Sequence, residues 1–430
     1  MNAMCPSRQT CKRLQFTMRI IVRTEMAGES MTKPLDGIRV VEVASWLAAP
    51  SCAALMADMG ASVIKVEPPA GDTYRRLFTD LLGEDFVHPS FQFDNRGKRG
   101  VCVDLDDEEG VALVHRLAGL CDIFITNLTR PRLERYRLTD EDIHAVAPAS
   151  IYAVLSGFGT TSVDQARQAF DQTAFWARSG AMSVFGDRDD GPLISRGGYG
   201  DRTTALNLLT AILAALRVKD QTGSGQFVEV TLQRTGVWAL ASDVNAALYE
   251  RTQPVKTSRR EPGNPIWNVY ATADERWVLL VMPMALPYWS RFCTMMEREE
   301  WIDDERFATT VGLARHATEV VPEISDLFRA HDLGYWREKL DAAGLIWEPV
   351  AELTDVIEDP VLRDAGAFSV LDHPRAGAME IVSAPFHVRD ADIAIRGPAP
   401  DIGEHTRDVF LEAGVDEAKV DELLDRGVLR

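Results

Sequence analysis

Residues 38–69, IRVVEVASWLAAPSCAALMADMGASVIKVEPP, decide the fold class of this chain. The apolar runs at the two ends of this stretch have the composition of buried strands. The segment between them is helix-forming, with Pro50 suited to the first helical turn and Gly60 to the helix end. The stretch is therefore typical of a βαβ unit, in which a helix connects two parallel strands.

The same alternation continues as far as residue 159. Further strands are predicted at 101–105, 122–127 and 150–159, and helices between them at 108–120 and 139–147. This pattern predicts an α/β fold with a Rossmann-like, doubly wound sheet, whose ligands bind at the carboxyl ends of the strands. The first turn, SWLAAP, lacks the glycines of GxGxxG, so a nicotinamide cofactor is disfavoured.

The length of 430 residues indicates more than one domain. We expect residues 34–225 to form the first part of a large domain, which ends at a glycine-rich hinge, DQTGSGQ. A small α+β domain is expected over 226–343. Residues 344–430 are expected to return to the large domain, making it discontinuous, and to end in two helices. Residues 1–33 are interpreted as a disordered tail or a mis-assigned start.

Composition limits the partners and the location. A formal charge of −19 argues against nucleic acid and anionic membranes, so an anionic ligand needs a local basic cluster. The six cysteines and eight histidines form no metal-binding pattern, and we expect no metal and a reducing, cytoplasmic location. No apolar run approaches the roughly 18 residues of a membrane span.

Basic residues cluster in three loops that the predicted sheet places at one edge. For any single residue, a solvated surface position is the simpler interpretation. Three clusters at one sheet edge of an acidic chain favour a polyphosphate ligand such as a nucleotide or coenzyme A. They are Arg75 and Arg76; Asn95 with Arg96, Lys98 and Arg99; and Asn127 with Arg130, Arg132, Arg135 and Arg137.

A second stretch, AFDQTAFWARSG at 169–180, places one carboxylate among aromatic residues. Asp171 follows Phe170 and opens a predicted helix that carries Phe175 and Trp176. From the local sequence alone, an acid that caps the helix N-terminus is the simpler interpretation. The alternative is a reactive group with a shifted pKa. A later helix, which begins near Asp201, is apolar nearly all round and is predicted to be buried.

Motifs along the chain resemble the class III CoA-transferase family, which includes formyl-CoA transferase, the carnitine and bile-acid CoA-transferases and the α-methylacyl-CoA racemases. The resemblance covers nearly everything from Pro34 onward. Its motifs are the 34–72 stretch, FQFDNRGKRGVCVDL, SGFG followed by AFD, GDRTTAL, TGSGQFVEVTL and DIGEHTRDVFLEAG. DQTAFWARSG and RREPGNPIWNVY are most similar to the subgroup that acts on aryl or branched-chain 2-hydroxy acids.

This resemblance implies a homodimer of interlocked rings and a reaction in which Asp171 is catalytic. The Asp171 carboxylate attacks an acyl-CoA to give a mixed anhydride, and the released thiolate then forms a β-aspartyl-CoA thioester. Coenzyme A is implied as a substrate, with no permanently bound cofactor. Its implied binding residues are Ser45, Trp46, Leu47 and Ala48 through their backbone, and Arg75, Asn95, Lys98, Arg99, Asn127 and Arg135.

The aromatic residues suggest the size of the acyl group. With Trp46, a pocket built from Phe170, Phe175, Trp176 and Trp267 suits a bulky apolar or aromatic acyl group, although each residue alone is more often core. The expected partners are therefore an acyl-CoA and a carboxylic acid.

Two other functions remain as alternatives. A racemase or epimerase is disfavoured because Phe170 stands where the racemases carry a histidine, and proton exchange at a carbon needs two bases. The racemases use an acid at the position that Asp201 occupies here. In this chain Asp201 is then interpreted as a helix cap or a structural hydrogen-bond partner. A CoA-binding protein without transferase chemistry is the second alternative.

Overall fold

The computed structural model describes residues 31–77, 82–83 and 86–430, so most of the predicted N-terminal tail lies outside the described residues. Its centre is a six-stranded sheet with the order β3-β2-β1-β4-β5-β6, and every neighbouring pair is parallel. This is the Rossmann strand order. The predicted α/β fold with a parallel central sheet is confirmed. The strands are β1 (Arg39–Val43), β2 (Ser62–Glu67), β3 (Arg99–Cys102), β4 (Ile123–Thr126), β5 (Ile151–Ser156) and β6 (Gln226–Thr231).

Helices cover both faces of this sheet. Successive strand residues point to opposite faces, so neighbouring residues belong to different cores. Val40 and Ile123 lie in one core with α2 and α9, whereas Val41 and Phe124 lie in a second core with α5, α7, α17 and α18. The helical elements of this large body are α2 (Ala48–Asp58), η1 (Thr73–Arg76), α4 (Pro89–Asn95), α5 (Glu108–Ala118), α6 (Arg130–Arg135), α7 (Asp140–Val146), η2 (Gln172–Ala177), α8 (Ala181–Val184), α9 (Tyr199–Thr222), α10 (Leu232–Ala239), α11 (Ala241–Glu250), α17 (Thr406–Glu412) and α18 (Glu417–Asp425).

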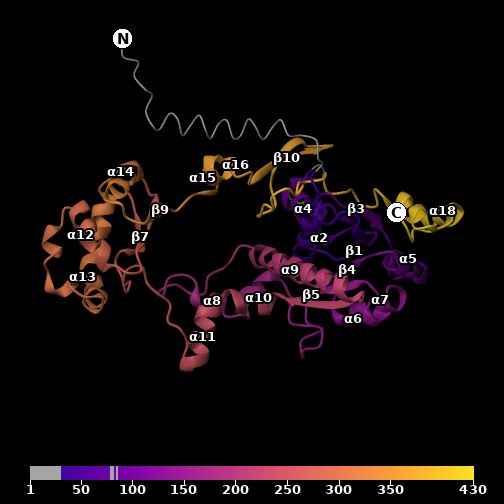
Figure 1. The fold of residues 1–430 in the computed structure, drawn as a ribbon, viewed down its shortest axis with the longest axis horizontal. Helices are drawn as coiled ribbons and strands as arrows, with labels where there is room; N and C mark the ends of the chain where they lie inside the picture. The colour runs from indigo at the N-terminus through magenta and orange to yellow at the C-terminus, as the bar shows by residue number, and fades with distance from the viewer. Residues whose placement is uncertain (1–30, 78–81, 84–85) are drawn as a thin grey trace, which may run out of the picture.

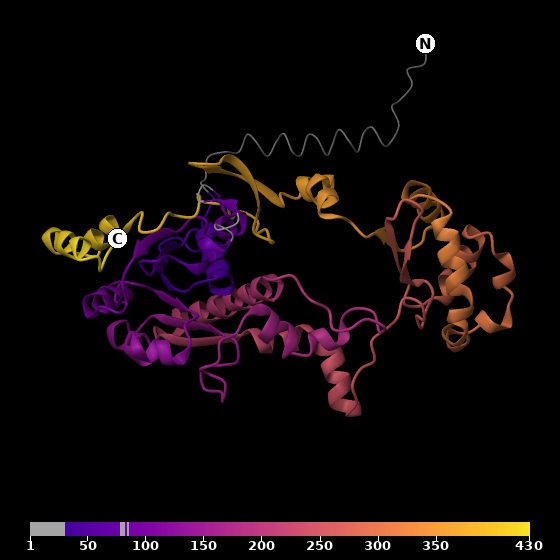
Figure 2. The ribbon, with the colours of Figure 1, turned by 180° about the vertical axis from the view of Figure 1, so that it is seen from behind.

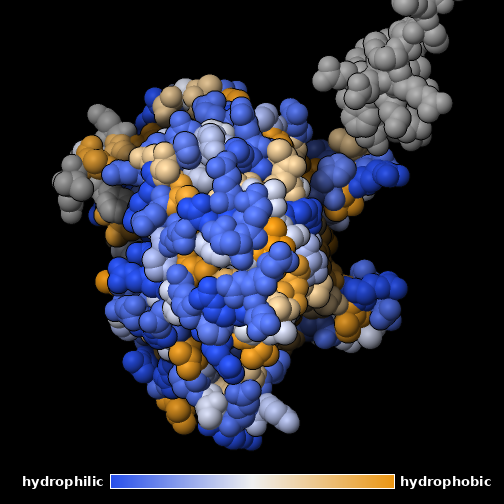
Figure 3. Space-filling view, turned by 90° about the vertical axis from the view of Figure 1, so that its left-hand side faces the viewer, coloured by the Kyte–Doolittle hydropathy of each residue, from blue (hydrophilic) through white to orange (hydrophobic). Residues whose placement is uncertain are grey.

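A smaller body with its own core lies at the other end of the molecule (Figure 1). Its three strands are antiparallel in the order β7-β8-β9, and helices pack on them. Its outer end presents mostly hydrophilic residues with scattered hydrophobic ones (Figure 3). Its elements are β7 (Trp267–Ala271), β8 (Trp277–Val281), α12 (Leu286–Met295), η3 (Glu299–Trp301), η4 (Glu305–Phe307), α13 (Thr310–Arg329), α14 (Leu333–Ala343) and β9 (Trp347–Pro349).

Two chain crossings join the two bodies (Figures 1 and 2). The return crossing contains α15 (Leu353–Glu358) and α16 (Pro360–Asp364), followed by a hairpin of β10 (Phe368–His373) and β11 (Gly377–Val382). The C-terminal residues then pack against β3, where the Cys102 N–H donates to Thr406 Oγ1 at 3.0 Å. No helix among the described residues is long and apolar enough to cross a membrane.

The structure differs from the expected domain boundaries at two strands. β6, expected to begin the small domain, pairs in parallel with β5 as the edge of the large sheet. The glycine-rich segment before it is not an interdomain hinge, because Gly223 ends α9 with a φ of +72°, a common helix C-terminus. β9 pairs with β8, so the small body continues past residue 343.

Helix α9 differs from its prediction, because it buries only one face. Ala205, Leu208 and Ile212 are buried, whereas Leu206 and Leu213 on the other side are 37% and 36% exposed. Helix α11 contains no buried residue. The protomer therefore leaves apolar helix surface uncovered.

Candidate active site

The site begins where the strand order reverses, between β1 and β4, at the carboxyl ends of the strands. The loops that follow these two strands are tied together by one side chain. Asn127 Nδ2 donates to the Ser45 carbonyl oxygen at 2.7 Å, and the Ser45 N–H donates to Asn127 Oδ1 at 3.1 Å. In open parallel sheets such a reversal point is the usual place for a ligand.

A cavity of about 400 Å³ opens at this point. It is lined by the loop after β1, by residues that follow β4 and β5, and by the start of α9. Its lining includes Ser45, Trp46, Leu47, Ala48, Asn127, Arg130, Arg132, Phe158, Arg167, Ala169, Phe170 and Asp201. Three arginines in its wall suit an anionic ligand.

Trp46 holds an unusual backbone conformation in the wall of this cavity. Its φ is +68°, a left-handed value that is costly for a bulky residue. Its N–H donates to Asp72 Oδ1 at 3.2 Å, and its ring makes an edge-to-face contact with Phe170 at 5.1 Å between centroids. The surrounding residues therefore keep this loop in a conformation that Trp46 alone would disfavour.

Asp171 lies directly after the lining residues Ala169 and Phe170 and is only 3% exposed. It occupies the N-cap position of η2, but its side chain makes no capping hydrogen bond there. Instead, Oδ2 accepts a hydrogen bond from the Gly198 N–H at 2.6 Å, while Oδ1 has no hydrogen-bond partner among the described residues. The carboxylate is thus held by the N-terminus of a different helix, α9.

Two glycines make this arrangement possible. Gly198 has a φ of +93°, which turns its N–H toward Asp171 and which other residues rarely adopt. Gly200 lies so close that a Cβ there would be 2.4 Å from Asp171 Oδ1 and 2.3 Å from the Phe175 ring. The GYGD sequence at the start of α9 therefore forms a backbone cradle for the carboxylate.

Burial and charge act on both acids of the site. Burial raises the pKa of Asp171, although the amides of Gly198 and Gly200 and the charge of Arg202 favour its ionised form. Burial, together with the nearby carboxylates of Asp171 and Asp94, raises the pKa of Asp201 to about 7. The structure also corrects the role expected for Asp201, because Gly198 occupies the N-cap position of α9.

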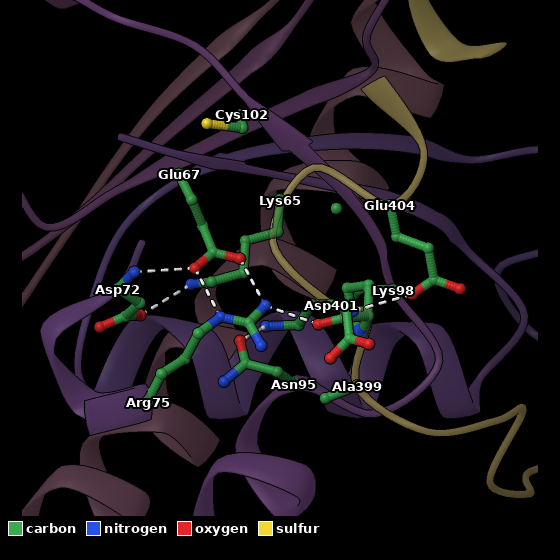
Figure 4. Close-up of polar contacts among 12 residues, drawn as sticks. Lys65, Glu67, Asp72, Arg75, Asn95, Lys98, Cys102, Ala399, Asp401 and Glu404 are labelled. Atoms are coloured by element: carbon green, nitrogen blue, oxygen red, sulfur yellow. Dashed lines mark hydrogen bonds and ion pairs between the residues drawn. The ribbon is translucent and has the colours of Figure 1, made fainter. Parts of the chain in front are cut away.

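Two of the predicted coenzyme A residues lie away from the cavity in a buried ion network (Figure 4). The Lys98 ammonium is 2.6 Å from Glu42 Oε2 and donates to Asn95 Oδ1 at 2.9 Å. Glu42 also pairs with Lys65, which pairs with Asp72, the residue that holds the Trp46 N–H. Lys98 and Asn95 thus support the loop from within the fold, and their donors and acceptors are already occupied.

The other predicted cationic residues are also engaged outside the cavity lining. Arg75 pairs with Glu67 at 2.6 Å, Arg99 with Glu412 at 2.6 Å, and Arg135 with Asp106 at 2.8 Å. Of the predicted coenzyme A residues, the structure brings together Asn127 and the Ser45, Trp46, Leu47 and Ala48 loop.

Of the four predicted pocket aromatics, only Phe170 lines the cavity. Phe175 and Trp176 are 3% and 8% exposed and belong to the core beside α9. Trp267 begins β7 in the small body and is 56% exposed. These three residues contribute packing in this protomer, so the structure does not place them in the wall of the cavity.

The cavity also contains residues that the sequence-based site prediction missed. Arg130 and Arg132 were part of a basic cluster, but nothing in the sequence separated them from Arg135. Arg167 and Phe158 follow β5, where only the SGFG motif marks a functional loop. Across the part of the chain that the structure describes, no group of His, Cys, Asp or Glu side chains could hold a metal ion.

Fold and site together define a class: α/β enzymes that bind an anionic ligand across the reversal point of a parallel sheet, beside a desolvated carboxylate. Within that class, this chain belongs to CoA-transferase family III, whose family model matches residues 35–406. It is therefore a CoA-transferase, an enzyme that uses CoA thioesters as substrates.

Similar proteins agree with this assignment over nearly the whole chain. A (R)-2-hydroxy-4-methylpentanoate CoA-transferase of Clostridioides difficile is 30% identical and covers 92% of this chain and 99% of its own. A cinnamoyl-CoA:phenyllactate CoA-transferase of Clostridium sporogenes is 27% identical, covering 92% and 97%. The crystal structure of a CAIB/BAIF family protein from Brucella suis matches with a TM-score of 0.79 and 27% identity, covering 88% and 99%.

Proposed function

We propose that this protein transfers coenzyme A from an acyl-CoA to a free carboxylic acid through covalent intermediates on Asp171, and that its acyl groups are branched or aromatic. The observation that carries the mechanism is the Asp171 carboxylate itself. One oxygen is fixed by the Gly198 N–H, and the other is buried and has no hydrogen-bond partner among the described residues. A buried carboxylate at a helix N-terminus combines nucleophilicity with a stabilised charge.

The reaction proceeds by alternating attacks at two carbonyl carbons. The Asp171 oxygen forms a bond to the thioester carbonyl carbon, the C–S bond breaks, and coenzyme A thiolate leaves a mixed anhydride. The thiolate then attacks the Asp171 carboxyl carbon, which releases the donor acid and leaves a β-aspartyl-CoA thioester. The acceptor acid reverses both steps. Water must be excluded, because it would hydrolyse the anhydride.

The charges of the cavity support a revised coenzyme A site. Arg130, Arg132 and Arg167 line the cavity and provide the positive charge that an anionic nucleotide ligand requires. The backbone of the Ser45 to Ala48 loop and Asn127 complete the contacts carried over from the sequence prediction. In this proposal Lys98 and Asn95 position that loop, because both side chains are buried and hydrogen-bonded.

Two observations support a branched or aromatic acyl group. Trp46 and Phe170 meet edge to face in the cavity wall, next to the position of Asp171. The relatives of C. difficile and C. sporogenes carry names that refer to a branched 2-hydroxy acid and to aromatic acids. An apolar aromatic wall binds such groups better than it binds small polar acids.

A homodimer of interlocked rings and a cytoplasmic location complete the proposal. The dimer is supported by the uncovered apolar residues of α9, α10 and α11, among them Trp238 and Tyr249, which are 77% and 90% exposed. Large exposed apolar surface marks an interface in most proteins. The described cysteines are buried free thiols, which fits a reducing compartment.

Trapping the aspartyl intermediate tests the proposed function. The enzyme is incubated with an aryl- or branched-chain acyl-CoA and then with hydroxylamine or borohydride, and the modified peptide is identified by mass spectrometry. We expect modification at Asp171 and loss of transfer in Asp171→Ala. An unmodified Asp171, with full transfer activity in Asp171→Ala, would overturn the mechanism. Deuterium uptake at the α-carbon without exchange of coenzyme A would instead identify an epimerase.

A further inference from the structure

Asp201 is a second acid in the site, and the mechanism above does not use it. It lies in the first turn of α9 and lines the same cavity as Phe170. Its carboxyl group makes no hydrogen bond and no ion pair with any described residue. An acid that lines a ligand cavity without a partner is available to the ligand.

The charged groups around Asp201 leave it without a counter-ion. Asp171 lies before η2, Asp94 lies on α4, and Arg202 is its neighbour on α9. The Arg202 guanidinium is already committed to Asp94, to which it donates at 3.0 Å and 3.3 Å. Asp201 therefore faces two carboxylates, while the nearest cation is shared with one of them.

The cavity arginines do not supply the missing partner. Arg130 pairs with Glu134 at 2.8 Å, and Arg167 lies 5.6 Å from the centre of the Phe158 ring. The Arg132 guanidinium lies over the ring of Tyr136 at 5.7 Å. Asp164, which also lines the cavity, pairs with Arg178 and adds a further acid. None of these groups forms an ion pair with Asp201 in the described structure.

Two nearby carboxyl groups in a desolvated site cannot both be ionised without a large repulsion. Asp171 has the Gly198 N–H to stabilise its negative charge, whereas Asp201 has no such donor. Burial and the two carboxylates accordingly raise the pKa of Asp201 to about 7. Below that pH Asp201 keeps its proton and is a hydrogen-bond donor.

We propose that Asp201 is a catalytic residue of the transfer reaction, which acts as a neutral carboxylic acid and donates a hydrogen bond to the oxyanion of the tetrahedral intermediate. This inference rests on the proposed function. When the Asp171 oxygen bonds to the thioester carbon, the carbonyl electron pair moves to oxygen, and the Asp201 O–H stabilises that charge. When the C–S bond breaks, the pair returns to the carbonyl. The proton remains on Asp201, so no net proton transfer occurs.

The place of Asp201 on α9, one residue after Gly200, brings it near the Asp171 carboxylate. A Cβ added at Gly200 would lie 2.4 Å from the unpartnered Asp171 Oδ1, and Asp201 is the next residue of the same helical turn. The attacking oxygen therefore lies close to the backbone position that precedes the proposed donor, and the donor itself lines the cavity. A hydrogen-bond donor that is already in position stabilises the transition state. Removing one such donor typically lowers kcat by about 10²- to 10³-fold.

The test compares Asp201→Asn, Asp201→Ala and a matched control, Asp220→Asn, which makes the same change at an exposed position near the other end of α9. Steady-state transfer of coenzyme A from an aromatic acyl-CoA to a free acid is followed from pH 5.5 to 9, and hydroxylamine trapping at Asp171 is measured in parallel. The amide of Asn keeps an N–H donor but cannot titrate, whereas Ala has no donor.

We expect the wild-type and Asp220→Asn rates to fall as the pH rises through about 7, because Asp201 then loses its proton. Asp201→Asn should remain active without this falling limb, and Asp201→Ala should lose about 10²-fold in kcat with little change in KM. A full rate in Asp201→Ala, or a falling limb retained in Asp201→Asn, overturns the inference. If the wild-type protein gives no adduct at Asp171, the proposed function itself fails.

Discussion

Gly200 determines how closely α9 can approach the Asp171 carboxylate. A Cβ at this position would lie 2.4 Å from Asp171 Oδ1 and 2.3 Å from the buried Phe175 ring, distances that side-chain atoms do not adopt without rearrangement. We expect Gly200→Ala to displace the carboxylate and to lower kcat by about 10²-fold, the effect of a displacement of ~1 Å at a reacting group. Steady-state transfer kinetics check this expectation.

The matched control is Gly334→Ala in α14. There the added Cβ would be 3.4 Å from Asp332 Oδ1, an ordinary contact, and the position is far from the cavity. Ala is a better helix former than Gly, so Gly334→Ala should keep full activity and gain up to about 1 kcal/mol in stability. Full activity in Gly200→Ala would show that Asp171 does not need its present position.

At this residue scale, the sequence singled out Asp171, the proposed nucleophile, but did not predict its contacts. Asp171 does stand before a helical turn, as the local pattern indicates, yet its hydrogen bond comes from Gly198, 27 positions further along the chain. Such a contact depends on tertiary packing, which a local capping rule does not contain. Asp201 was misinterpreted for the same reason, because its charge environment includes residues from two other elements.

The loop after β1 depends on ion pairs that connect several elements. Lys98, next to β3, pairs with Glu42 of β1, and Lys65 of β2 bridges Glu42 and Asp72. All of these side chains are buried. Removing one member of a buried ion pair leaves an uncompensated charge, which costs about 3–5 kcal/mol. We therefore expect Lys98→Met to destabilise the protein by about that amount, measured by urea unfolding.

The neighbouring residue provides the comparison. Arg99 pairs with Glu412, whose side chain is 63% exposed, so Arg99→Met should cost less than about 1 kcal/mol. The double variant Glu42→Gln/Lys98→Met, which removes both charges, should recover part of the stability lost in Lys98→Met. If Lys98→Met is as stable as the wild type and only weakens binding of the acyl-CoA, Lys98 is a ligand-binding residue after all.

Helices and strands were predictable where the hydrophobic periodicity is strong. A boundary was misassigned where glycines fit two different structures. The βαβ alternation in residues 38–69 led directly to the parallel sheet, because two buried strands and a helix bounded by Pro50 and Gly60 leave a clear pattern. The segment before β6 contains two glycines that suit either a hinge or a helix end, and only the pairing with β5 distinguishes them. Buried Lys98 resembled a ligand-binding residue, because the sequence does not reveal that Glu42 lies opposite.

At the scale of the whole molecule, two bodies connected by two crossings leave much apolar surface uncovered (Figure 1). The outer end of the small body is mostly hydrophilic, as expected for a surface that faces water (Figure 3). By contrast, α11 buries no residue, and Trp238 and Tyr249 of α10 and α11 are strongly exposed. A second copy of the chain is the partner that the proposed interlocked dimer supplies.

Light scattering after size exclusion tests the dimer. We expect a mass of twice the 47.7 kDa of one chain, unchanged on dilution, because an interlocked arrangement cannot separate without opening a ring. Trp238→Asp/Tyr249→Asp places two charges on exposed apolar positions, which in an interface core costs about 2 kcal/mol or more each, and should yield monomers or aggregates. The control Ser242→Asp/Asn245→Asp adds the same charge at exposed polar positions of α11 and should remain dimeric. A monomeric wild-type protein would contradict the interlocked dimer, and a dimeric Trp238→Asp/Tyr249→Asp variant would exclude the α10 and α11 surface from the interface.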